Sequence, residues 1–359
     1  MPAPIPPLTL PSELAVVALT PGGVALARRL TPQLATATCY LPQRFATDDG
    51  HRYYDEPVMR LLPRLFAAGT PLLCLMATGI VVRALAPVLR GKEHDPAVVV
   101  MDEAGRFAIS LLAGHLGGAN DLARILEARC GATAVITTAT DVHQLPAWDT
   151  VARELGLTLE PVAHLRRLNR LLLEAGRIAL CDPYGAVSAR FAPLSQVRLV
   201  EELPAAGSGV EGRVAVTHRL LDEEDDLLLL RPRDLVIGVG CNRDTCADEI
   251  KETVRALLQQ AQLSPASVAR FATIEAKRDE AGITEAAARF GVEVDYHLPV
   301  ALNAVAVPSP PSEHALAAVG ARGVCEPAAL LSAGARQLLL RKQARGNVTV
   351  AIASLPFSG

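Results

Sequence analysis

The sequence predicts a multi-domain α/β protein, with parallel or mixed sheets flanked by helices in its N- and C-terminal units and a smaller α/β region between them. The 359 residues exceed what one ordinary core accommodates, so two or three domains are expected. Half of the residues are apolar but only 4% are aromatic, which favours aliphatic strands covered by Ala- and Leu-rich helices. We expect a flexible tail over residues 1–12, an N-terminal domain over 13–154, a middle region over 155–231 and a C-terminal domain over 232–359.

The N-terminal unit begins with a strand, a Pro-Gly-Gly turn and a helix. Leu122, Ile125 and Leu126 show the i, i+3, i+4 spacing of a later amphipathic helix. The polar segment 44–56 is expected to be a loop. Short apolar runs predict strands at 14–19, 36–41, 72–76, 97–101, 107–112 and 134–137, and helical patterns are expected at 24–30 and 80–89.

The middle region carries a helical pattern at 162–174, a strand at 177–180 and weaker strands near Val197 and Val214. Its acidic run, 222–226, is expected to be a solvated turn. The C-terminal unit then starts with a strong strand–turn–helix pattern. Its strand is predicted at 235–240, Thr245 is the expected helix cap, and Ile250, Val254, Leu257 and Leu258 form the buried stripe of the helix. Further strands are predicted at 271–274, 292–294 and 348–352.

Composition excludes several classes of function. The formal net charge is −3 and no basic stripe is interleaved with aromatic residues, so no nucleic-acid partner is expected. The N-terminus lacks the pattern of a signal peptide, and the most apolar window, 71–82, is too short to cross a bilayer. The seven cysteines follow neither a disulfide nor a zinc spacing. We therefore expect a cytoplasmic protein with reduced thiols, no membrane contact and no metal site.

Small and polar residues follow three strands of the N-terminal unit, where open α/β sheets bind ligands. Gly114-His-Leu-Gly-Gly-Ala-Asn120 lies between a strand and a helix, and such a loop favours an anion such as phosphate or carboxylate. A tight turn packed under the helix is the alternative. Thr78-Gly79 and Thr137-Thr138-Ala-Thr-Asp141 occupy the other two junctions. Arg83, Arg90 and Lys92 follow the first of these and supply cations for ligand carboxylates.

The C-terminal unit offers a fourth junction of this kind, Gly238-Val-Gly240-Cys241-Asn-Arg243. Cys241 and Cys246 have no second pair to complete a metal site. Lys277, Glu280 and Glu326 are further ionisable candidates, for which surface or helix-cap roles are the alternative. No Gly-x-Ser-x-Gly elbow is present, which disfavours a serine-hydrolase mechanism.

Longer stretches of sequence are more specific indicators of a family than any single glycine loop. The strings at 78–83, 95–100, 114–120 and 136–141, with Lys92 and Asp102-Glu103, resemble in this order the N-terminal part of the cobalt-precorrin-5A hydrolases, which act in cobalamin biosynthesis. Those at 238–241, 272–274 and 326–330, with Lys277 and Asp279-Glu280, resemble the C-terminal domain of that family. The likeness extends from about residue 60 to the C-terminus and is weakest in the middle region.

This resemblance implies hydrolytic opening of the δ-lactone of cobalt-precorrin-5A, which gives cobalt-precorrin-5B and acetaldehyde. Cobalt arrives inside the substrate, so no cofactor is expected. His115 is the candidate general base because its ordinary pKa lies near neutrality, with Asp102, Glu103 or Asp141 orienting it or protonating the departing fragment. Axial contact of His115 with the cobalt is its alternative role. Backbone N–H groups of Gly117 and Gly118 are the candidate oxyanion donors. The expected substrate-binding residues are Thr78, Gly79, Arg83, Lys92, Gly114, Gly117, Gly118, Asn120, Thr138, Gly240, Cys241, Lys277, Glu280 and Glu326.

Two other classes of function remain open at this point. One is a nucleotide- or phosphate-dependent enzyme that uses the 114–120 loop as a phosphate cradle, although no Lys-Ser/Thr pair follows the loop. The other is a non-catalytic carrier or scaffold for cobalt-corrinoid intermediates. Expected partners are the corrinoid substrate, with neighbouring pathway methyltransferases and a second copy of the chain as further candidates.

Overall fold

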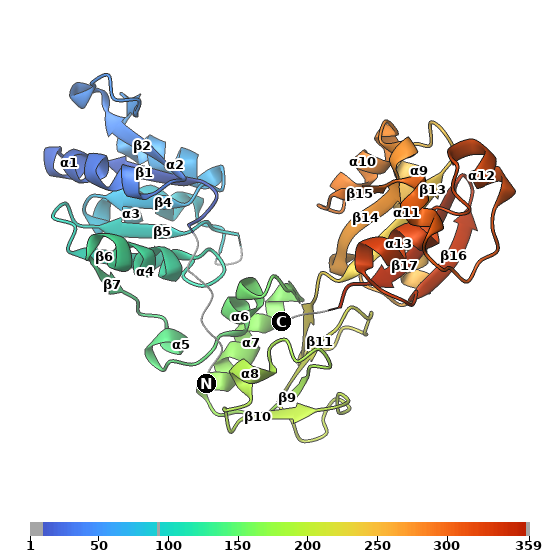
Figure 1. Ribbon diagram of the computed structural model, residues 1–359. Coiled ribbons are helices and arrows are strands. Elements are labelled where there is room, and N and C mark those ends of the chain that lie inside the picture. The colour runs from blue at the N-terminus through green and yellow to red at the C-terminus, as the bar shows by residue number, and fades with distance from the viewer. Residues whose placement is uncertain (1–9, 92–93, 357–359) are drawn as a thin grey trace. The chain divides into compact units, whose positions relative to one another are not determined.

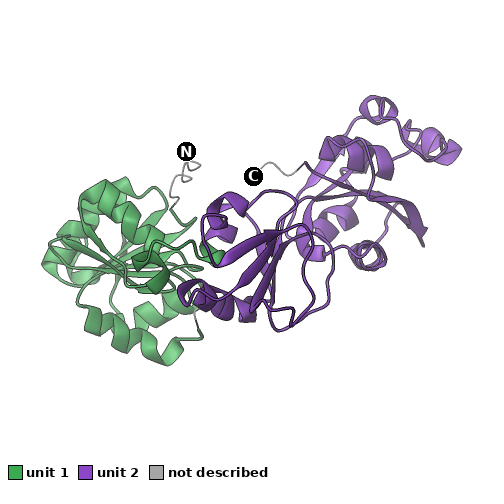
Figure 2. Cartoon of the chain, turned by 90° about the horizontal axis from the view of Figure 1, so that it is seen from below, with its two compact units in different colours: residues 1–150 green, residues 151–359 purple. Residues whose placement is uncertain are grey.

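The computed structural model of the protein describes residues 10–91 and 94–356. Its contacts divide the chain into two compact units, Met1–Thr150 and Val151–Gly359 (Figure 2). The first unit contains one seven-stranded sheet and the second contains two five-stranded sheets, each flanked by helices (Figure 1). This architecture confirms the predicted α/β class. None of the helices in the described ranges combines the length and apolarity that a bilayer crossing requires.

The first unit alternates strands and helices. Its strands are β1 (Leu14–Ala18), β2 (Ala37–Pro42), β3 (Arg52–Tyr54), β4 (Leu72–Leu75), β5 (Val98–Met101), β6 (Phe107–Leu112) and β7 (Thr133–Val135); its helices are α1 (Pro21–Leu30), α2 (Val58–Ala67), α3 (Thr78–Leu85), α4 (Ala119–Cys130) and α5 (Ala139–Val142), and α6 (Trp148–Glu154) begins at its end. Short 3₁₀ turns add η1 (Thr31–Gln33), η2 (Gln43–Phe45) and η3 (Ala86–Val88).

The sheet order of this unit is β3-β2-β1-β4-β5-β6-β7. All neighbouring strands are parallel except β5 and β6, which are antiparallel. Side chains alternate between the two faces because the strand period is two residues. In β1, Val16 joins the core under α1 and α4, whereas Val17 joins the core under α2 and α3.

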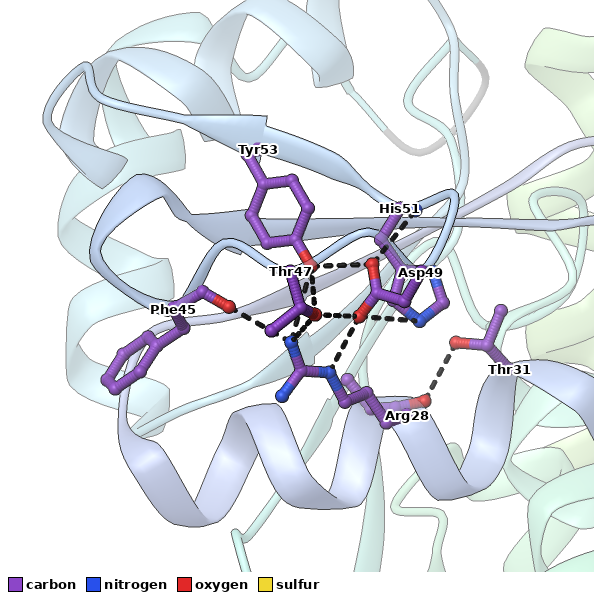
Figure 3. Close-up of polar contacts among 8 residues, drawn as sticks. Arg28, Thr31, Phe45, Thr47, Asp49, His51 and Tyr53 are labelled. Atoms are coloured by element: carbon purple, nitrogen blue, oxygen red, sulfur yellow. Dashed lines mark hydrogen bonds and ion pairs between the residues drawn. The ribbon is translucent and has the colours of Figure 1, made fainter.

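The segment predicted as a loop, 44–56, contains more structure than expected. It includes part of η2 and the edge strand β3. A network of hydrogen bonds connects the stretch between η2 and β3 to α1 (Figure 3). Arg28 Nε donates to Asp49 Oδ2 over 2.9 Å, and the Tyr53 hydroxyl donates to Asp49 Oδ1 over 2.6 Å. The hydrogen bond from Tyr53 is the largest cause of the strongly lowered pKa of Asp49. The polarity of this segment therefore reflects an internal network and not an open loop.

The second unit contains the middle and C-terminal sheets. The middle region comprises β8 (Thr158–Glu160), β9 (Ile178–Cys181), β10 (Val197–Val200), β11 (Gly212–Val216), β12 (Leu227–Arg231), α7 (Val162–Leu173) and α8 (Ser188–Phe191). The C-terminal region comprises β13 (Leu235–Cys241), β14 (Val268–Ile274), β15 (Val294–His297), β16 (Leu340–Arg345), β17 (Val348–Ser354), α9 (Ala247–Gln260), α10 (Ala281–Ala288), α11 (Pro299–Asn303), α12 (Glu313–Val319), α13 (Cys325–Ala333), η4 (Pro265–Ser267) and η5 (Glu275–Lys277).

The middle sheet has the order β10-β9-β11-β12-β8, in which only β8 is antiparallel to its neighbour. The acidic run before β12 is only partly the solvated turn that was predicted: Asp222, Glu223 and Asp225 are exposed, whereas Glu224 and Asp226 are half-buried. Asp226 and Glu224 pair with Arg213, whose side chain is only 4% exposed. A buried guanidinium requires such partners because removing an unpaired charge from water is costly.

The C-terminal sheet has the order β15-β14-β13-β17-β16, with β13, β14 and β15 parallel and β17 and β16 antiparallel to their neighbours. Ile237 packs toward α9 and α10, whereas Val236 packs toward α13 on the other face. The predicted stripe of α9 is fully buried. The predicted cap is wrong: Cys246 occupies the N-cap position, and the Thr245 hydroxyl donates instead to the Asn242 carbonyl.

Candidate functional site

His115 lies in the loop that connects β6 to α4. The loop closes on itself, because the Gly118 N–H donates to the His115 carbonyl over 3.0 Å and the Asn120 N–H donates to the Gly114 carbonyl over 3.0 Å. Gly117 packs so tightly that a Cβ there would lie 2.4 Å from the Ala113 Cβ, and Gly118 has a φ of 86°. Glycine is therefore required at both positions. Since its N–H is already used, Gly118 is not the oxyanion donor that was predicted.

The imidazole of His115 lies between two carboxylates. Its Nε2 is 2.8 Å from Asp141 Oδ2 and 3.2 Å from the Thr140 hydroxyl, and its Nδ1 is 3.4 Å from Asp149 Oδ2. The exposed fractions of the three ionisable side chains are 15% for His115, 16% for Asp141 and 6% for Asp149. Both ring nitrogens therefore face acids in a largely buried setting.

Asn120 and Arg124 position Asp141 from α4. The buried Asn120 amide donates to Asp141 Oδ2 over 2.9 Å and to the Thr138 hydroxyl over 3.2 Å, and its carbonyl accepts from Ser110 over 2.6 Å. Arg124 donates to the other carboxylate oxygen, Oδ1. The N-terminal turn of one helix thus orients the carboxylate that contacts His115.

The two carboxylates keep His115 charged. Burial acts against the imidazolium, but hydrogen bonds and charges from Asp141 and Asp149 outweigh it and raise the pKa of His115 to about 9. For Asp141, burial is likewise the largest single effect, and the contacts with His115 and Arg124 outweigh it and lower its pKa. The pKa of His115 in the folded protein therefore lies above the ordinary value near neutrality that motivated its assignment as a base, and the imidazolium is favoured at pH 7.

This charge makes the stability of the protein depend on pH. The folded-state pKa exceeds the ordinary value of 6.5, so the stabilisation is complete below about pH 6.5 and is lost as the pH rises through about 9. The shift corresponds to about 3 kcal/mol. We expect the difference in free energy of unfolding between the wild type and His115→Ala, measured by urea denaturation, to shrink over this window. His143→Ala is the matched control because this exposed histidine contacts neither carboxylate; an equal pH dependence of both variants would contradict the prediction.

Comparison with known proteins identifies the family. The cobalamin synthesis G N-terminal, cobalamin biosynthesis central region and cobalamin synthesis G C-terminus models match residues 60–141, 146–232 and 235–353. The chain is 35% identical to the cobalt-precorrin-5A hydrolase of Priestia megaterium, with 98% of this chain and 97% of the relative covered. It belongs to the cobalt-precorrin-5A hydrolase family.

A second member of the cobalt-precorrin-5A hydrolase family, from Salmonella typhimurium, is 33% identical, with 95% of this chain and 97% of the relative covered. Among solved structures, CobE, described as a protein from the cobalamin (vitamin B12) biosynthetic pathway, is 30% identical. That match covers 34% of this chain and 89% of the CobE chain, with a TM-score of 0.31.

The other predicted residues of the first unit that the structure describes lie at the opposite end of the strands from His115. Because β5 is antiparallel to β6, the carboxyl ends of β4 and β5 lie at one end of the sheet and the carboxyl end of β6 lies at the other. Asp102 accepts from Arg106 in the β5–β6 turn, Glu103 accepts from Thr20, and Arg83 donates to the Gly79 carbonyl of its own helix. Thr78 begins that same helix, α3. Asp102 and Glu103 therefore do not contact His115, and Lys92 lies outside the described residues.

The five predicted residues of the C-terminal unit come together. Gly240, Cys241, Lys277, Glu280 and Glu326 line one cavity of about 570 Å³ at the carboxyl ends of β13 and β14. Burial raises the pKa of the Cys241 thiol, which favours the neutral thiol over the nucleophilic thiolate. Within residues 10–91 and 94–356, no three His, Cys, Asp or Glu side chains form a group that could hold a metal ion.

Sequence reasoning missed four residues at these two places. Asp149 and Arg124 complete the His115 cluster, and Arg322 and Lys342 line the C-terminal cavity. The only sequence signal at Asp149 is its place in the first turn of a helix. An acidic residue there indicates no more than a favourable interaction with the helix dipole. Arg322 lies in the glycine-containing turn between α12 and α13, and Lys342 lies in β16, so neither follows a strand that leads into a helix.

Proposed function

We propose that this chain hydrolyses the δ-lactone of cobalt-precorrin-5A, giving cobalt-precorrin-5B and acetaldehyde. The observation that carries the proposal is the near-full-length likeness to two relatives that both bear the name cobalt-precorrin-5A hydrolase. The His115 cluster supports it, because a buried imidazolium flanked by carboxylates is suited to proton transfer. The substrate supplies the cobalt, so the reaction requires no metal or cofactor of the protein.

In this proposal His115 is a proton donor and not the base considered from sequence. Water adds to the lactone carbonyl, and the ring C–O bond breaks with its electron pair on the departing oxygen. The Nε2–H of His115 already faces Asp141 and Thr140, and a substrate oxygen on that side accepts the proton as it leaves. The hydroxyl then loses its proton and its oxygen becomes the carbonyl oxygen of acetaldehyde, while the electron pair of the broken C–C bond passes to the macrocycle, which takes up a proton in its place. The new carboxylic acid returns a proton to His115, so the overall change is the consumption of one water and the release of one acetaldehyde.

The decisive experiment is anaerobic incubation of the full chain with cobalt-precorrin-5A. We expect the macrocycle to gain one water and lose one acetaldehyde, a net loss of the elements C2H2, with one equivalent of acetaldehyde detected by NADH oxidation with alcohol dehydrogenase. A macrocycle that is bound but unchanged in mass would support a carrier in place of an enzyme. The absence of binding would overturn both functions.

We place this activity in the cytoplasm, where the seven cysteines, all free within the described chain, stay reduced. Association with a second copy or with a pathway methyltransferase is an additional proposal. Gel filtration of the chain with and without the candidate methyltransferase tests it, with co-elution as the expected result.

A further inference from the structure

The C-terminal cavity lies where an α/β sheet commonly binds ligands. From β13 the chain adds β14 and β15 on one side, and after α13 the antiparallel β16–β17 hairpin places β17 on the other side of β13. The direction of strand addition therefore reverses at β13 (Figure 1). The crevice beyond the carboxyl end of a strand at such a reversal is the usual ligand position. Its volume of about 570 Å³ lies in the range of small-molecule sites.

Both carboxylates in the cavity wall already accept hydrogen bonds from other groups of the protein. Glu326 is 2% exposed and accepts from the Ser309 N–H, the Ser309 hydroxyl and the Lys342 N–H at 2.9 to 3.2 Å. Glu280 accepts from Lys277 Nζ over 2.9 Å and from the Asp244 N–H over 3.0 Å. These contacts lower the pKa of Glu280, with Lys277 as the largest cause. The carboxylate of Glu326 thus connects the Ser309 and Lys342 segments of the cavity wall.

Two cationic residues of the cavity wall do not pair with either of these carboxylates. Arg322 and Lys342 line the cavity, and their charged groups form no hydrogen bond or ion pair with another side chain in the described ranges. Both residues are exposed. Ile274, Val307 and Val319 add an apolar surface to the same cavity. The cavity thus combines an apolar wall with available positive charge.

We propose that this cavity binds the corrinoid through its carboxylate side chains, with Arg322 and Lys342 as the carboxylate contacts. The inference rests on the proposed function for the identity of the ring, but the requirement for an apolar body that carries carboxylates comes from the cavity itself. Charge-assisted hydrogen bonds to carboxylates are about twice as strong as neutral ones, so each cation contributes directly to affinity.

The test is calorimetric titration of the full chain with cobyrinic acid, a corrinoid polycarboxylate, and with its methyl ester, which keeps the ring but has no charge. We expect Arg322→Gln and Lys342→Gln each to weaken binding of the acid about tenfold, an effect typical of one lost charged hydrogen bond, and to leave binding of the ester unchanged. Arg341→Gln is the matched control, because Arg341 is exposed in the same strand but does not line the cavity.

Equal affinity of the wild type and both cavity variants for the acid would overturn the proposal. Equal affinity of the wild type for the ester and the acid would also overturn it, as would displacement of the acid by citrate at comparable concentration, which indicates a general anion site. Binding of the acid that depends on Arg322 and Lys342, without acetaldehyde release from cobalt-precorrin-5A, would support the cavity and remove the hydrolase function.

Discussion

Replacing Asp141 with asparagine is expected to lower the kcat of lactone opening by at least about 100-fold, the lower range for loss of a positioned proton-transfer group. The variant keeps the shape of the side chain but removes the charge that contacts His115 and Arg124. Without that charge, His115 loses its nearest support as an imidazolium. The measurement is acetaldehyde release at saturating substrate, with far-UV circular dichroism to verify folding.

Asp121→Asn is the matched control for this prediction. Asp121 lies in the first turn of α4 and pairs with the same arginine over 3.3 Å. We expect the variant to retain kcat within about threefold, because the contacts of Asp141 with Arg124 and with His115 both remain. Equal activity of Asp141→Asn and Asp121→Asn would remove the His115 cluster from the mechanism.

Replacing Gly238 with alanine is expected to destabilise the second unit by about 3 kcal/mol or more, at the upper end of overpacking effects. A Cβ at this position of β13 would lie 1.9 Å from the Cys325 carbonyl oxygen and 2.9 Å from the Ala329 Cβ. The obstacle is the backbone of α13, which cannot rotate away as a side chain can. The measurement is the shift of the thermal unfolding transition by circular dichroism.

Gly323→Ala is the control, because a Cβ there meets no atom within 4 Å. Its unfolding temperature should equal that of the wild type or slightly exceed it, since alanine restricts the unfolded chain. Unchanged stability of Gly238→Ala would show that α13 moves away from β13 at little cost.

Much of the fold was predictable because buried strands are continuous apolar runs. The runs at β1, β4, β5 and β13 were located within one or two residues, and the periodic stripe of α9 was correct throughout. The edge strand β3 was missed because its three residues are polar or tyrosine, and an edge strand is only partly buried. Its position depends on the Asp49 network, which no local pattern indicates.

The candidate site was predicted only in part, because placing Asp102 and Glu103 beside His115 requires β5 and β6 to run in the same direction, whereas the two strands are antiparallel. A parallel connection requires a dozen or more residues, whereas only the turn from Asp102 to Arg106 separates β5 from β6. That short spacing indicated a hairpin, and therefore that Asp102 and Glu103 could not accompany His115. Asp149 was beyond prediction, because its contact with His115 depends on how the chain returns after α5.

The hairpin also has a practical consequence for labelling the enzyme. Its tip, around Gly105, turns with a φ of 72° at the edge of the sheet remote from His115. A fluorophore or affinity tag inserted there can report on the first unit while the His115 cluster keeps its native surroundings. The antiparallel pair of β5 and β6 thus gives the first unit an attachment position that is physically separate from the His115 cluster.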